Sequence, residues 1–564
     1  MTVHARPVLA SRSAARVLVD QLIAQRVDHV FCIPGESYMP VLDALRDSGI
    51  AVTVCRNEGG MAMMAEAYGK ATGRPGVCFV TRGPGAANAM AGLHVARQDS
   101  TPLILFAGQV ERARKDREAT QEIDYRAVFG SIAKWAAEID QPARMAEYVG
   151  RAFATAMAGR PGPVALALPR DMLSEQVTCG DAPYVAALET APGAEEMAAL
   201  EDLLAGAARP MLILGGSRWS EEACAQVMRF AERFALPVAT GYRRAPLFDQ
   251  GHPNYAGDLG LNANPKLVAR IKASDLVIAI GARLNETTTQ GYTLFDMPRP
   301  QMKLVHAYPG AEEIGRVFHP HLAIHASPRR FAAALDRLAP RTAPRWTAET
   351  EAANAEYRAF SDAPLPQPGD VNLGALMIWL RDHLPADAIL CNGAGGFAAW
   401  IHRFYRFRRF GTHFAPVSQS MGYGVPAAVA LKRLYPARRV VSISGDGDFL
   451  MSGQEFVTAV QYDLPIISLV LDNGLYGSIR LHQERQHPGR PIATDLRNPD
   501  FAAWAQSCGG FGRIVERTED FAAAFRAAED SGRPALIHVK YDADGAAPGV
   551  TLSGARAAAS SGLA

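Results

Sequence analysis

Two polar residues stand at the ends of two successive apolar runs, where they could bind a metal ion and a phosphate group. Asp446 lies between two glycines after the run VVSIS, and Asn473 follows the run IISLVL, 27 residues further along the chain. This interval accommodates one strand–helix–strand circuit, which returns the chain to the same edge of a parallel sheet. Ligands of such sheets bind at the carboxyl ends of the strands. Carboxylate and amide oxygens suit Mg²⁺, which keeps phosphate oxygens in its octahedron.

The glycines beside Asp446 point to the same chemistry. Gly445 and Gly447 allow backbone N–H groups to approach a phosphate closely, beside the N-terminus of a helix that we expect near residues 452–462. Taken alone, this Gly-Asp-Gly turn is equally typical of an ordinary strand end at which the aspartate caps a helix. The asparagine at the observed interval is what favours a metal site.

The stretch from Ser442 to Gly477 resembles the thiamine diphosphate signature, and the whole chain resembles the acetolactate-synthase-like branch of thiamine diphosphate enzymes. The resemblance covers about residues 14–540. It implies that the side chains of Asp446 and Asn473 and the backbone carbonyl of Leu475 bind Mg²⁺, which in turn binds the diphosphate. Asp472 stands where the family usually has an asparagine, and we expect that change to be tolerated. Two further residues of the implied cofactor site are Gly447 and Asp448.

A second group of candidate residues begins at Glu58, which opens a helix rich in small residues after the run CRN. By itself, an acidic residue at this place is simply favoured by the helix dipole. The resemblance implies more: Glu58 would protonate the aminopyrimidine ring of the cofactor and so promote removal of its C2 proton. A carboxyl group with that task must be poorly solvated, which raises its pKa towards the working pH.

The resemblance also assigns the remaining cofactor contacts. The segment Asn392–Trp400 resembles a diphosphate loop, although Gly396-Phe397-Ala398 replaces the usual polar Gln-His-Gln stretch. Backbone contacts survive such a change, and side-chain contacts do not. The implied residues are Gly35 in a Pro-Gly turn, Asn88 on the pyrimidine side, Gln109 as a catalytic residue at the reacting centre, Gly395 and Gly396 at the diphosphate, the backbone of Gln419 at the aminopyrimidine, and Met421 as the apolar wedge under the bent cofactor.

Three residues set this chain apart from biosynthetic acetolactate synthase. On the helix after the metal site, Arg480 stands where a methionine is usual and His482 where a tryptophan is usual, and Arg97 replaces a frequent phenylalanine. Arginine suits carboxylate or phosphate recognition, so we expect weak coupling of two pyruvate molecules and a preference for an anionic or larger substrate. The alternative is that the two arginines extend to solvent from helix faces.

The flavin of acetolactate synthase stays an open question in this sequence. Arg283 stands in the position of an FAD-contacting arginine, but it is equally typical of a strand end. The segment Thr240–Pro253 replaces the family's glycine-rich stretch on the flavin side. FAD is therefore possible but unassigned.

Three functions compete. The first is an acetolactate-synthase-like decarboxylation or carboligation of a 2-keto acid. The second is a thiamine-diphosphate-dependent carbon–carbon lyase or decarboxylase of the 2-hydroxyacyl-CoA, oxalyl-CoA or benzoylformate type. The third is a nucleotide-binding or phosphate-transferring α/β protein without thiamine, which is disfavoured because GxxxxGK[ST] and a post-strand GxGxxG are both missing.

The elements that must position these residues repeat three times along the chain. Apolar strand-like runs alternate with helical segments, which predicts parallel sheets with helices on both faces. We expect three doubly wound α/β domains: a pyrimidine-binding domain at residues 1–180, a central domain at 190–345 and a diphosphate- and Mg-binding domain at 365–545. Residues 546–564 have the small-residue composition of a frayed tail.

Composition excludes several classes of protein. Lysine and arginine number 58 against 57 acidic residues, so neither a nucleic-acid footprint nor a polybasic membrane face is present. The longest apolar stretch, Leu464–Leu471, is far too short to span a bilayer, and the N-terminus has no signal-peptide core. Seven scattered cysteines without CxxC spacing argue against a disulfide framework or structural zinc. We expect a cytoplasmic enzyme, and the resemblance implies a homodimer or homotetramer in which two chains build each site.

Overall fold

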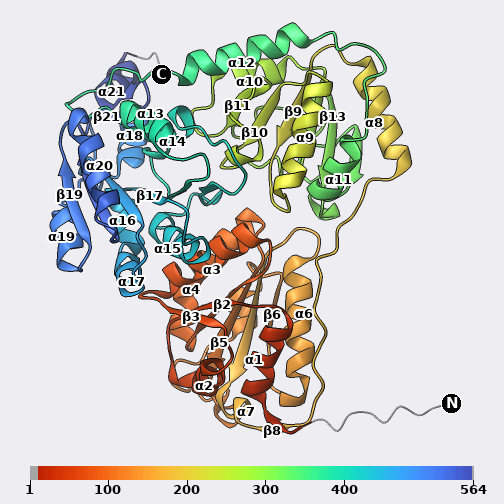
Figure 1. The fold of residues 1–564 in the computed structure, drawn as a ribbon, viewed down its shortest axis with the longest axis vertical. Helices are drawn as coiled ribbons and strands as arrows, with labels where there is room; N and C mark the ends of the chain where they lie inside the picture. The colour runs from red at the N-terminus through yellow and green to blue at the C-terminus, as the bar shows by residue number, and fades with distance from the viewer. Residues whose placement is uncertain (1–9, 562–564) are drawn as a thin grey trace. The chain divides into compact units, whose positions relative to one another are not determined.

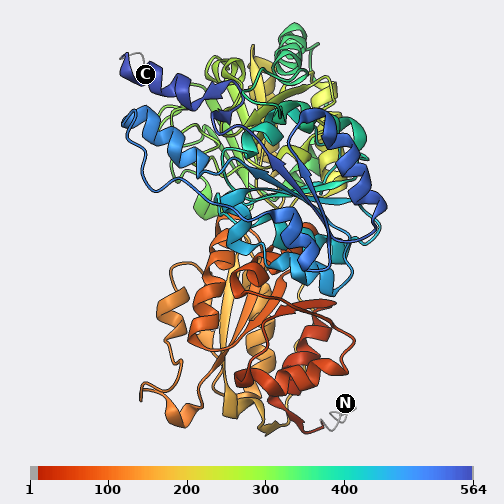
Figure 2. The ribbon, with the colours of Figure 1, turned by 90° about the vertical axis from the view of Figure 1, so that its left-hand side faces the viewer.

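The structure is a computed structural model that describes residues 10–561. The chain divides into two compact units, with the division between Leu188 and Glu189. The first unit holds one six-stranded sheet and the second holds two, and neighbouring strands are parallel in all three sheets (Figures 1 and 2). This confirms the predicted fold class of three parallel-sheet α/β domains.

In the sheet of the first unit, alternate residues of the strands face opposite layers of helices. Val30, Phe79 and Phe106 pack against α1, α2 and α6, whereas the ring of Phe31 lies 6.4 Å from that of Tyr68 in α3. In sheet order, the strands are β3 (Ala51–Val54), β2 (His29–Cys32), β4 (Gly76–Val80), β5 (Leu103–Gln109), β7 (Pro163–Pro169) and β6 (Trp135–Glu138). The helices are α1 (Ala14–Ala24), α2 (Met39–Arg46), α3 (Glu58–Thr72), α4 (Gly83–Asp99), α5 (Tyr125–Phe129), α6 (Met145–Met157) and α7 (Arg170–Leu173), and β1 (Arg12–Ser13) pairs with β8 (Gln176–Val177).

The first sheet of the second unit forms the centre of the chain. Its helices α8, α9 and α11 cover one face and α10 covers the other. In sheet order, the strands are β11 (Tyr255–Leu259), β10 (Val238–Gly241), β9 (Pro210–Leu214), β12 (Leu276–Ile280), β13 (Lys303–Tyr308) and β14 (Leu322–His325). The helices are α8 (Ala194–Gly206), α9 (Glu221–Arg233), α10 (Pro265–Lys272), α11 (Pro328–Leu335) and α12 (Thr347–Ser361).

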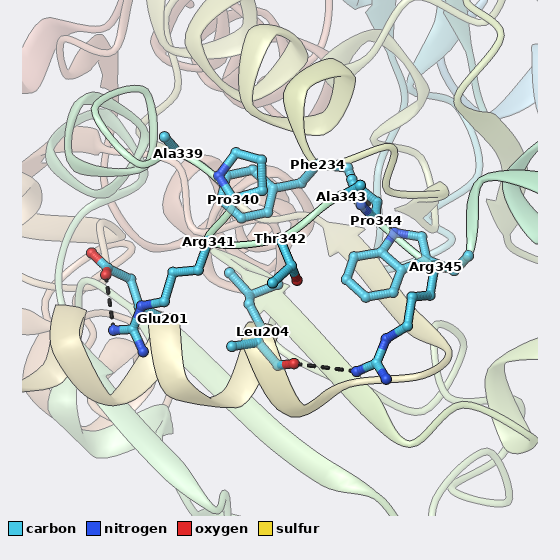
Figure 3. Close-up of a pocket in the computed structure, with 12 residues that line it drawn as sticks. Glu201, Leu204, Phe234, Ala339, Pro340, Arg341, Thr342, Ala343, Pro344 and Arg345 are labelled. Carbon is cyan, nitrogen blue, oxygen red and sulfur yellow. Dashed lines mark hydrogen bonds and ion pairs between the residues drawn. The ribbon is translucent and has the colours of Figure 1, made fainter.

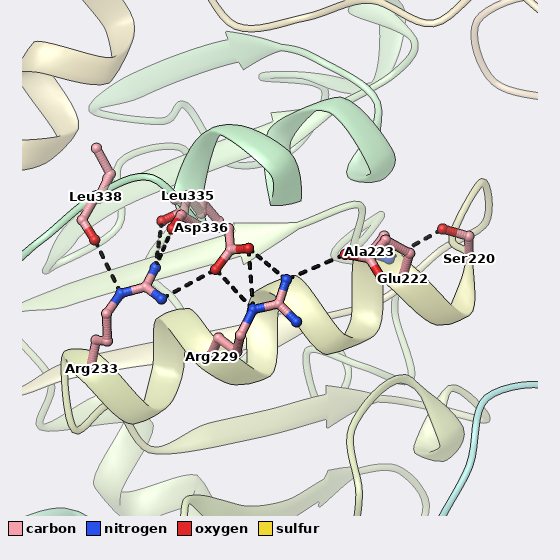
Figure 4. A network of polar contacts seen from close by, with 8 residues as sticks. All are labelled: Ser220, Glu222, Ala223, Arg229, Arg233, Leu335, Asp336 and Leu338. Carbon is pink, nitrogen blue, oxygen red and sulfur yellow. Dashed lines mark hydrogen bonds and ion pairs between the residues drawn. The ribbon is translucent and has the colours of Figure 1, made fainter.

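Arginine pairs fix the helices of this central sheet. Arg229 and Arg233 of α9 both reach Asp336 at the end of α11, and they hold the pKa of that carboxyl below its usual range (Figure 4). The segment that follows is tied to α8, because Arg341 pairs with Glu201 and Arg345 donates to the carbonyl of Ala205 (Figure 3). These contacts link α9, α11 and the segment after α11 to one another and to α8.

The second sheet of this unit carries the predicted metal residues. Helices α13, α14 and α20 pack on one face, and α15 packs on the other. In sheet order, the strands are β16 (His413–Phe414), β15 (Ile389–Asn392), β17 (Val440–Gly445), β18 (Ile467–Asp472), β20 (Ala535–Lys540) and β19 (Phe511–Val515). The helices are α13 (Leu373–His383), α14 (Ala398–Phe404), α15 (Gly424–Leu434), α16 (Asp446–Ser452), α17 (Glu455–Gln461), α18 (Gly477–Gln486), α19 (Phe501–Ser507) and α20 (Phe521–Asp530).

Hydrogen bonds and ion pairs join the two sheets of the second unit. The backbone N–H of Gln250 donates to the carbonyl of Phe407 at 3.1 Å, and the N–H of Phe407 donates to the side-chain oxygen of Gln250 at 2.7 Å. His402 of α14 contacts Asp258 of β11, with 3.1 Å between Nδ1 and Oδ2. Because these contacts join the central domain to the C-terminal domain, the two domains form one compact unit.

The end of the chain is ordered where the sequence predicted a frayed tail. β21 (Gly545–Ala547) and β22 (Val550–Thr551) form a hairpin that leads into α21 (Leu552–Ser560). Arg556 donates two hydrogen bonds to Glu484 of α18, at 2.8 and 2.6 Å, and lowers the pKa of this buried carboxyl to about 2. The prediction is wrong for residues 546–560: the alanines interpreted as a tail are strong helix formers, and the buried Glu484 requires a cationic partner.

Two further observations concern the cysteines and the helices. Cys32, Cys55, Cys78 and Cys391 are buried free thiols, and burial raises the pKa of Cys32 to about 11. Within residues 10–561, no helix combines the length and the apolar character needed to cross a bilayer.

Candidate active site

Glu58 is the first residue of α3 in the first unit, as the sequence predicted. The side chain of Asn57 caps this helix by accepting from the N–H of Gly59 at 2.8 Å. Asn88 of α4 donates from Nδ2 to Glu58 Oε2 at 3.0 Å. The half-buried Glu58 carboxylate is thus directed at the neighbouring helix that carries Asn88.

Two glycines pack closely against Glu58 and Thr81. A Cβ atom at Gly85 would lie 3.3 Å from Glu58 Oε1 and 3.3 Å from the Cγ2 atom of Thr81, and one at Gly35 would lie 2.5 Å from the Cβ of Thr81. Gly35 therefore cannot carry a side chain without moving Thr81. The absence of side chains at these two positions permits close approach of another group.

Gln109 and Arg97 lie in the same unit but are not grouped with Glu58. Gln109, at the end of β5, is 1% exposed, and its amide donates to the carbonyl of Ile123 at 3.0 Å. Arg97 lies in the last turn of α4, nine residues beyond Asn88, which is about 13 Å along a helix axis. The structure thus groups Glu58 with Asn88 and leaves the predicted reacting-centre role of Gln109 a proposal.

In the second unit, Asp446 and Asn473 lie at one edge of the parallel sheet. They directly follow β17 and β18, which are neighbours with Gly445 in register with Leu471. Asp446 is also the first residue of α16, a short helix that the sequence did not predict, and the helix expected near residues 452–462 is present as α17. Asp446 and Asp448 favour the additional helix because acidic side chains stabilise the first turn of a helix.

The two carboxyl groups at this edge, Asp446 and Asp472, have pKa values shifted in opposite directions. Burial and the nearby Asp472 carboxylate raise the pKa of Asp446 to about 6. Burial also opposes the ionisation of Asp472, but hydrogen bonds outweigh it and lower its pKa: His538 contacts Oδ2 at 2.8 Å and the N–H of Gly474 donates to Oδ1 at 2.9 Å. A buried carboxylate beside a second negative charge is the electrostatic setting that a divalent cation stabilises.

Sequence reasoning missed Asn498, which contacts both carboxylates. Its Nδ2 donates to Asp446 Oδ2 at 2.7 Å and to Asp472 Oδ1 at 2.8 Å. Asn498 follows a segment that runs antiparallel to the predicted metal ligand Leu475, through a bridge between Leu475 and Asp495. No local pattern identifies Asn498, because it lies in an irregular segment 52 residues from Asp446.

Asp448 joins the predicted diphosphate loop, Asn392–Trp400, to the loop predicted to face the aminopyrimidine, residues 416–422, which we call the pyrimidine-side loop. Its Oδ1 accepts the N–H groups of Ala394 and Gly422, both at 2.9 Å. Burial raises the pKa of Asp448 to about 6, although these two amides act in the opposite direction. Gly395 and Gly396 are half-buried in the first loop, and Gln419 and Met421 lie in the second. Gln419 has φ +57°, a left-handed conformation that a non-glycine residue adopts at a cost.

The sequence suggested that the charge of Arg480 is available to a substrate, but in the structure its guanidinium group is bonded within the protein. It is 9% exposed on α18, with Nε donating to Thr494 Oγ1 and Nη2 to Asp495 Oδ1, both at 2.6 Å. Its charge is therefore paired, and its contacts hold the segment that borders Leu475. His482, by contrast, is exposed on the same helix.

Comparison with known proteins decides the family. Three family models of thiamine pyrophosphate enzymes match the chain in order. The N-terminal TPP binding domain matches residues 12–128, the central domain matches residues 197–335, and the C-terminal TPP binding domain matches residues 393–539. The acetolactate synthase isozyme 2 large subunit of Escherichia coli (strain K12) is 32% identical over 538 residues, which cover 94% of this chain and 96% of that protein. The chain belongs to the thiamine pyrophosphate enzymes.

Other relatives place the protein in the same branch of this family. The acetolactate synthase large subunit of Parasynechococcus marenigrum is 32% identical over 544 residues, covering 93% of this chain and 87% of that protein. The acetolactate synthase of Bacillus subtilis is 29% identical over 546 residues, covering 95% and 94%. The protein is thus a thiamine-diphosphate-dependent enzyme of the acetolactate-synthase-like type. The lyase alternative is not favoured, and a phosphate-binding protein without thiamine is excluded.

Proposed function

We propose that this enzyme uses thiamine diphosphate and Mg²⁺ to decarboxylate a 2-keto acid and to join the remaining fragment to an acceptor. The observation that carries the proposal is the position of Asp446 and Asn473 at one sheet edge, beside the N-terminus of α16. A helix N-terminus and Mg²⁺ together bind a diphosphate group.

The donors present fit Mg²⁺. Asp446 and Asn473 would supply a carboxylate and an amide oxygen, and Leu475 a backbone carbonyl. These are hard oxygen ligands, and three protein ligands leave the rest of an octahedron for phosphate oxygens and water. Asn498 would orient Asp446 from behind through its 2.7 Å hydrogen bond.

When bound, thiamine diphosphate supplies a carbon nucleophile for the keto group and a sink for the electrons released with CO₂. Glu58 would hold and exchange a proton at its carboxyl oxygens with the aminopyrimidine ring. Asn88 fixes the orientation of that carboxyl through its hydrogen bond to Oε2. We do not assign substrate choice to Arg480, because Thr494 and Asp495 already occupy its guanidinium group.

The proposed activity is tested by mixing the purified protein with thiamine diphosphate, Mg²⁺ and one keto acid at a time: pyruvate, 2-ketobutyrate, glyoxylate or benzoylformate. We expect CO₂ release together with a carbon–carbon coupled product, and loss of both after treatment with a metal chelator. Cleavage of a 2-hydroxyacyl-CoA or of oxalyl-CoA, without consumption of any keto acid, would establish the lyase alternative instead.

Two observations in the central domain argue against a bound flavin. Arg283, the candidate FAD contact, directs its Nε at the buried carboxylate of Glu313, 3.4 Å away. In the segment Thr240–Pro253, which replaces the family's flavin-side stretch, large side chains such as Tyr242 and Phe248 are buried. We therefore propose that the enzyme carries no FAD.

We further propose that the active form is a homodimer or a homotetramer built from chains of three domains. The support is the family resemblance, in which the glutamate-bearing domain of one subunit and the metal-binding domain of another form each site.

Subunit mixing tests this arrangement. Glu58→Gln and Asp446→Ala should each be nearly inactive alone, but a co-expressed mixture should regain about a quarter of wild-type activity, because half of randomly formed dimers are mixed and one of their two sites is intact. If each site came from a single chain, both sites of a mixed dimer would carry one defect, and activity would stay at the level of the single variants.

A further inference from the structure

The largest fully buried side chain outside the residues discussed so far is a cation. Arg243 is 2% exposed and lies in the turn after β10, in the segment that replaces the flavin-side stretch. Its φ is +57°, and its guanidinium carbon lies 5.0 Å from the centre of the Tyr242 ring. A buried guanidinium in a strained turn is costly, so the structure must supply it with strong acceptors.

Both acceptors of Arg243 belong to the C-terminal domain. Nη2 donates to the carbonyl of Gly393 at 2.8 Å, at the start of the predicted diphosphate loop. Nη1 donates to the carbonyl of Pro416 at 2.7 Å. The same Pro416 carbonyl accepts the N–H of Gln419 at 3.0 Å and closes the turn in which Gln419 is left-handed. One planar fork therefore joins the two loops that would hold opposite ends of the cofactor.

Asp448 contacts the same two loops through their backbone amides. While Arg243 takes the carbonyls of Gly393 and Pro416, Asp448 takes the amides of Ala394 and Gly422. The packing is tight: a Cβ atom at Gly393 would lie 2.1 Å from Asp448 Oδ1. The guanidinium group of Arg243, from the central domain, and the carboxylate of Asp448, from α16, thus each bind the backbone of both loops.

We infer that Arg243 is a positioning residue for thiamine diphosphate: it pre-forms the diphosphate loop and the pyrimidine-side loop from the central domain. This inference rests on the proposed cofactor site, and it gives the central domain a function in cofactor binding. The diphosphate loop needs such support because its own side chains are small or apolar at Gly395, Gly396 and Phe397. A lysine cannot replace the arginine, since its single ammonium group lacks the planar fork that reaches two fixed carbonyls at once.

The test measures thiamine diphosphate binding by calorimetry in the presence of Mg²⁺, using the full chain. Arg243→Lys retains the charge and should raise the dissociation constant by about ten-fold or more, because at least one charge-assisted hydrogen bond is lost or distorted. Arg408→Lys is the matched control: Arg408 pairs with Asp249 at the same domain junction, contacts neither loop, and should bind the cofactor like the wild type.

Hydrogen exchange of the unliganded proteins separates positioning from general stability. In Arg243→Lys, peptides that cover residues 393–397 and 416–422 should exchange faster than in the wild type, while peptides of the central sheet should not change. Wild-type affinity and unchanged exchange in these two peptides would overturn the inference, as would an equal increase in exchange throughout the second unit. A wild-type protein that binds no thiamine diphosphate would instead refute the proposed function.

Discussion

Glu58→Gln is expected to lower keto-acid turnover by about 10²–10⁴-fold, the contribution typical of a positioned acid–base group. The amide has nearly the shape of the carboxyl group and can still face Asn88, so the fold and the affinity for thiamine diphosphate should be retained. What is lost is the ability to give and take a proton. The direct measurement is the rate at which the C2 proton of the bound cofactor exchanges with deuterium, read by NMR after acid quench.

Glu147→Gln provides the control for this experiment. Glu147 is an exposed glutamate of α6 that pairs with Arg144, remote in sequence from the glycine-flanked surroundings of Glu58. It should exchange the C2 proton at the wild-type rate. Exchange in Glu58→Gln at that same rate would show that another group carries the proton, and the assignment of Glu58 would fail.

Asp446→Ala should abolish Mg²⁺-dependent binding of thiamine diphosphate. It removes the only carboxylate among three proposed protein ligands, and Mg²⁺ depends on such a ligand to offset its own dehydration. It also deprives Asn498 of one of its two acceptors. Calorimetric titration of the metal-free protein with thiamine diphosphate, with and without Mg²⁺, gives the loss directly.

Asp500→Ala separates this loss from simple destabilisation. Asp500 caps α19 through the N–H groups of Ala502 and Ala503, so its removal should cost about 1 kcal/mol of stability. Cofactor binding should nevertheless persist, since Asp500 is not one of the proposed ligands. Equal affinity for thiamine diphosphate in Asp446→Ala and the wild type would refute the metal assignment.

The sheets were predictable from sequence because their inner strands are continuous apolar runs. β17, which ends at Gly445, and β18, which ends at Asp472, both lie where the pattern predicted them, and their parallel pairing follows from the helical segment between them. The edge strand β19 carries no clear apolar pattern, because the consecutive residues Arg513 and Ile514 are both exposed and two glycines, Gly509 and Gly510, precede the strand. Edge strands carry a weaker signal than central ones.

The polar contacts around the site were beyond sequence reasoning for a different reason. Arg243 reaches Gly393 across 150 positions, and Asn498 reaches Asp446 across 52. No periodicity links such pairs, since each depends on how separate elements come together. The substitution of arginine at position 480 illustrates the same limit: residue type suggested a charge for a substrate, and only the fold revealed Thr494 and Asp495 as its partners.

The junction between the central and C-terminal domains also determines how this enzyme can be recombined with its relatives. A chimera that exchanged only the central domain would separate Arg243 and Gln250 from the native residues of the C-terminal domain to which they are hydrogen-bonded, Gly393, Pro416 and Phe407. Hybrid proteins should instead be joined near Leu188, where the two compact units divide, so that residues 189–564 are inherited as one block. The central and C-terminal sheets are therefore better exchanged together than singly.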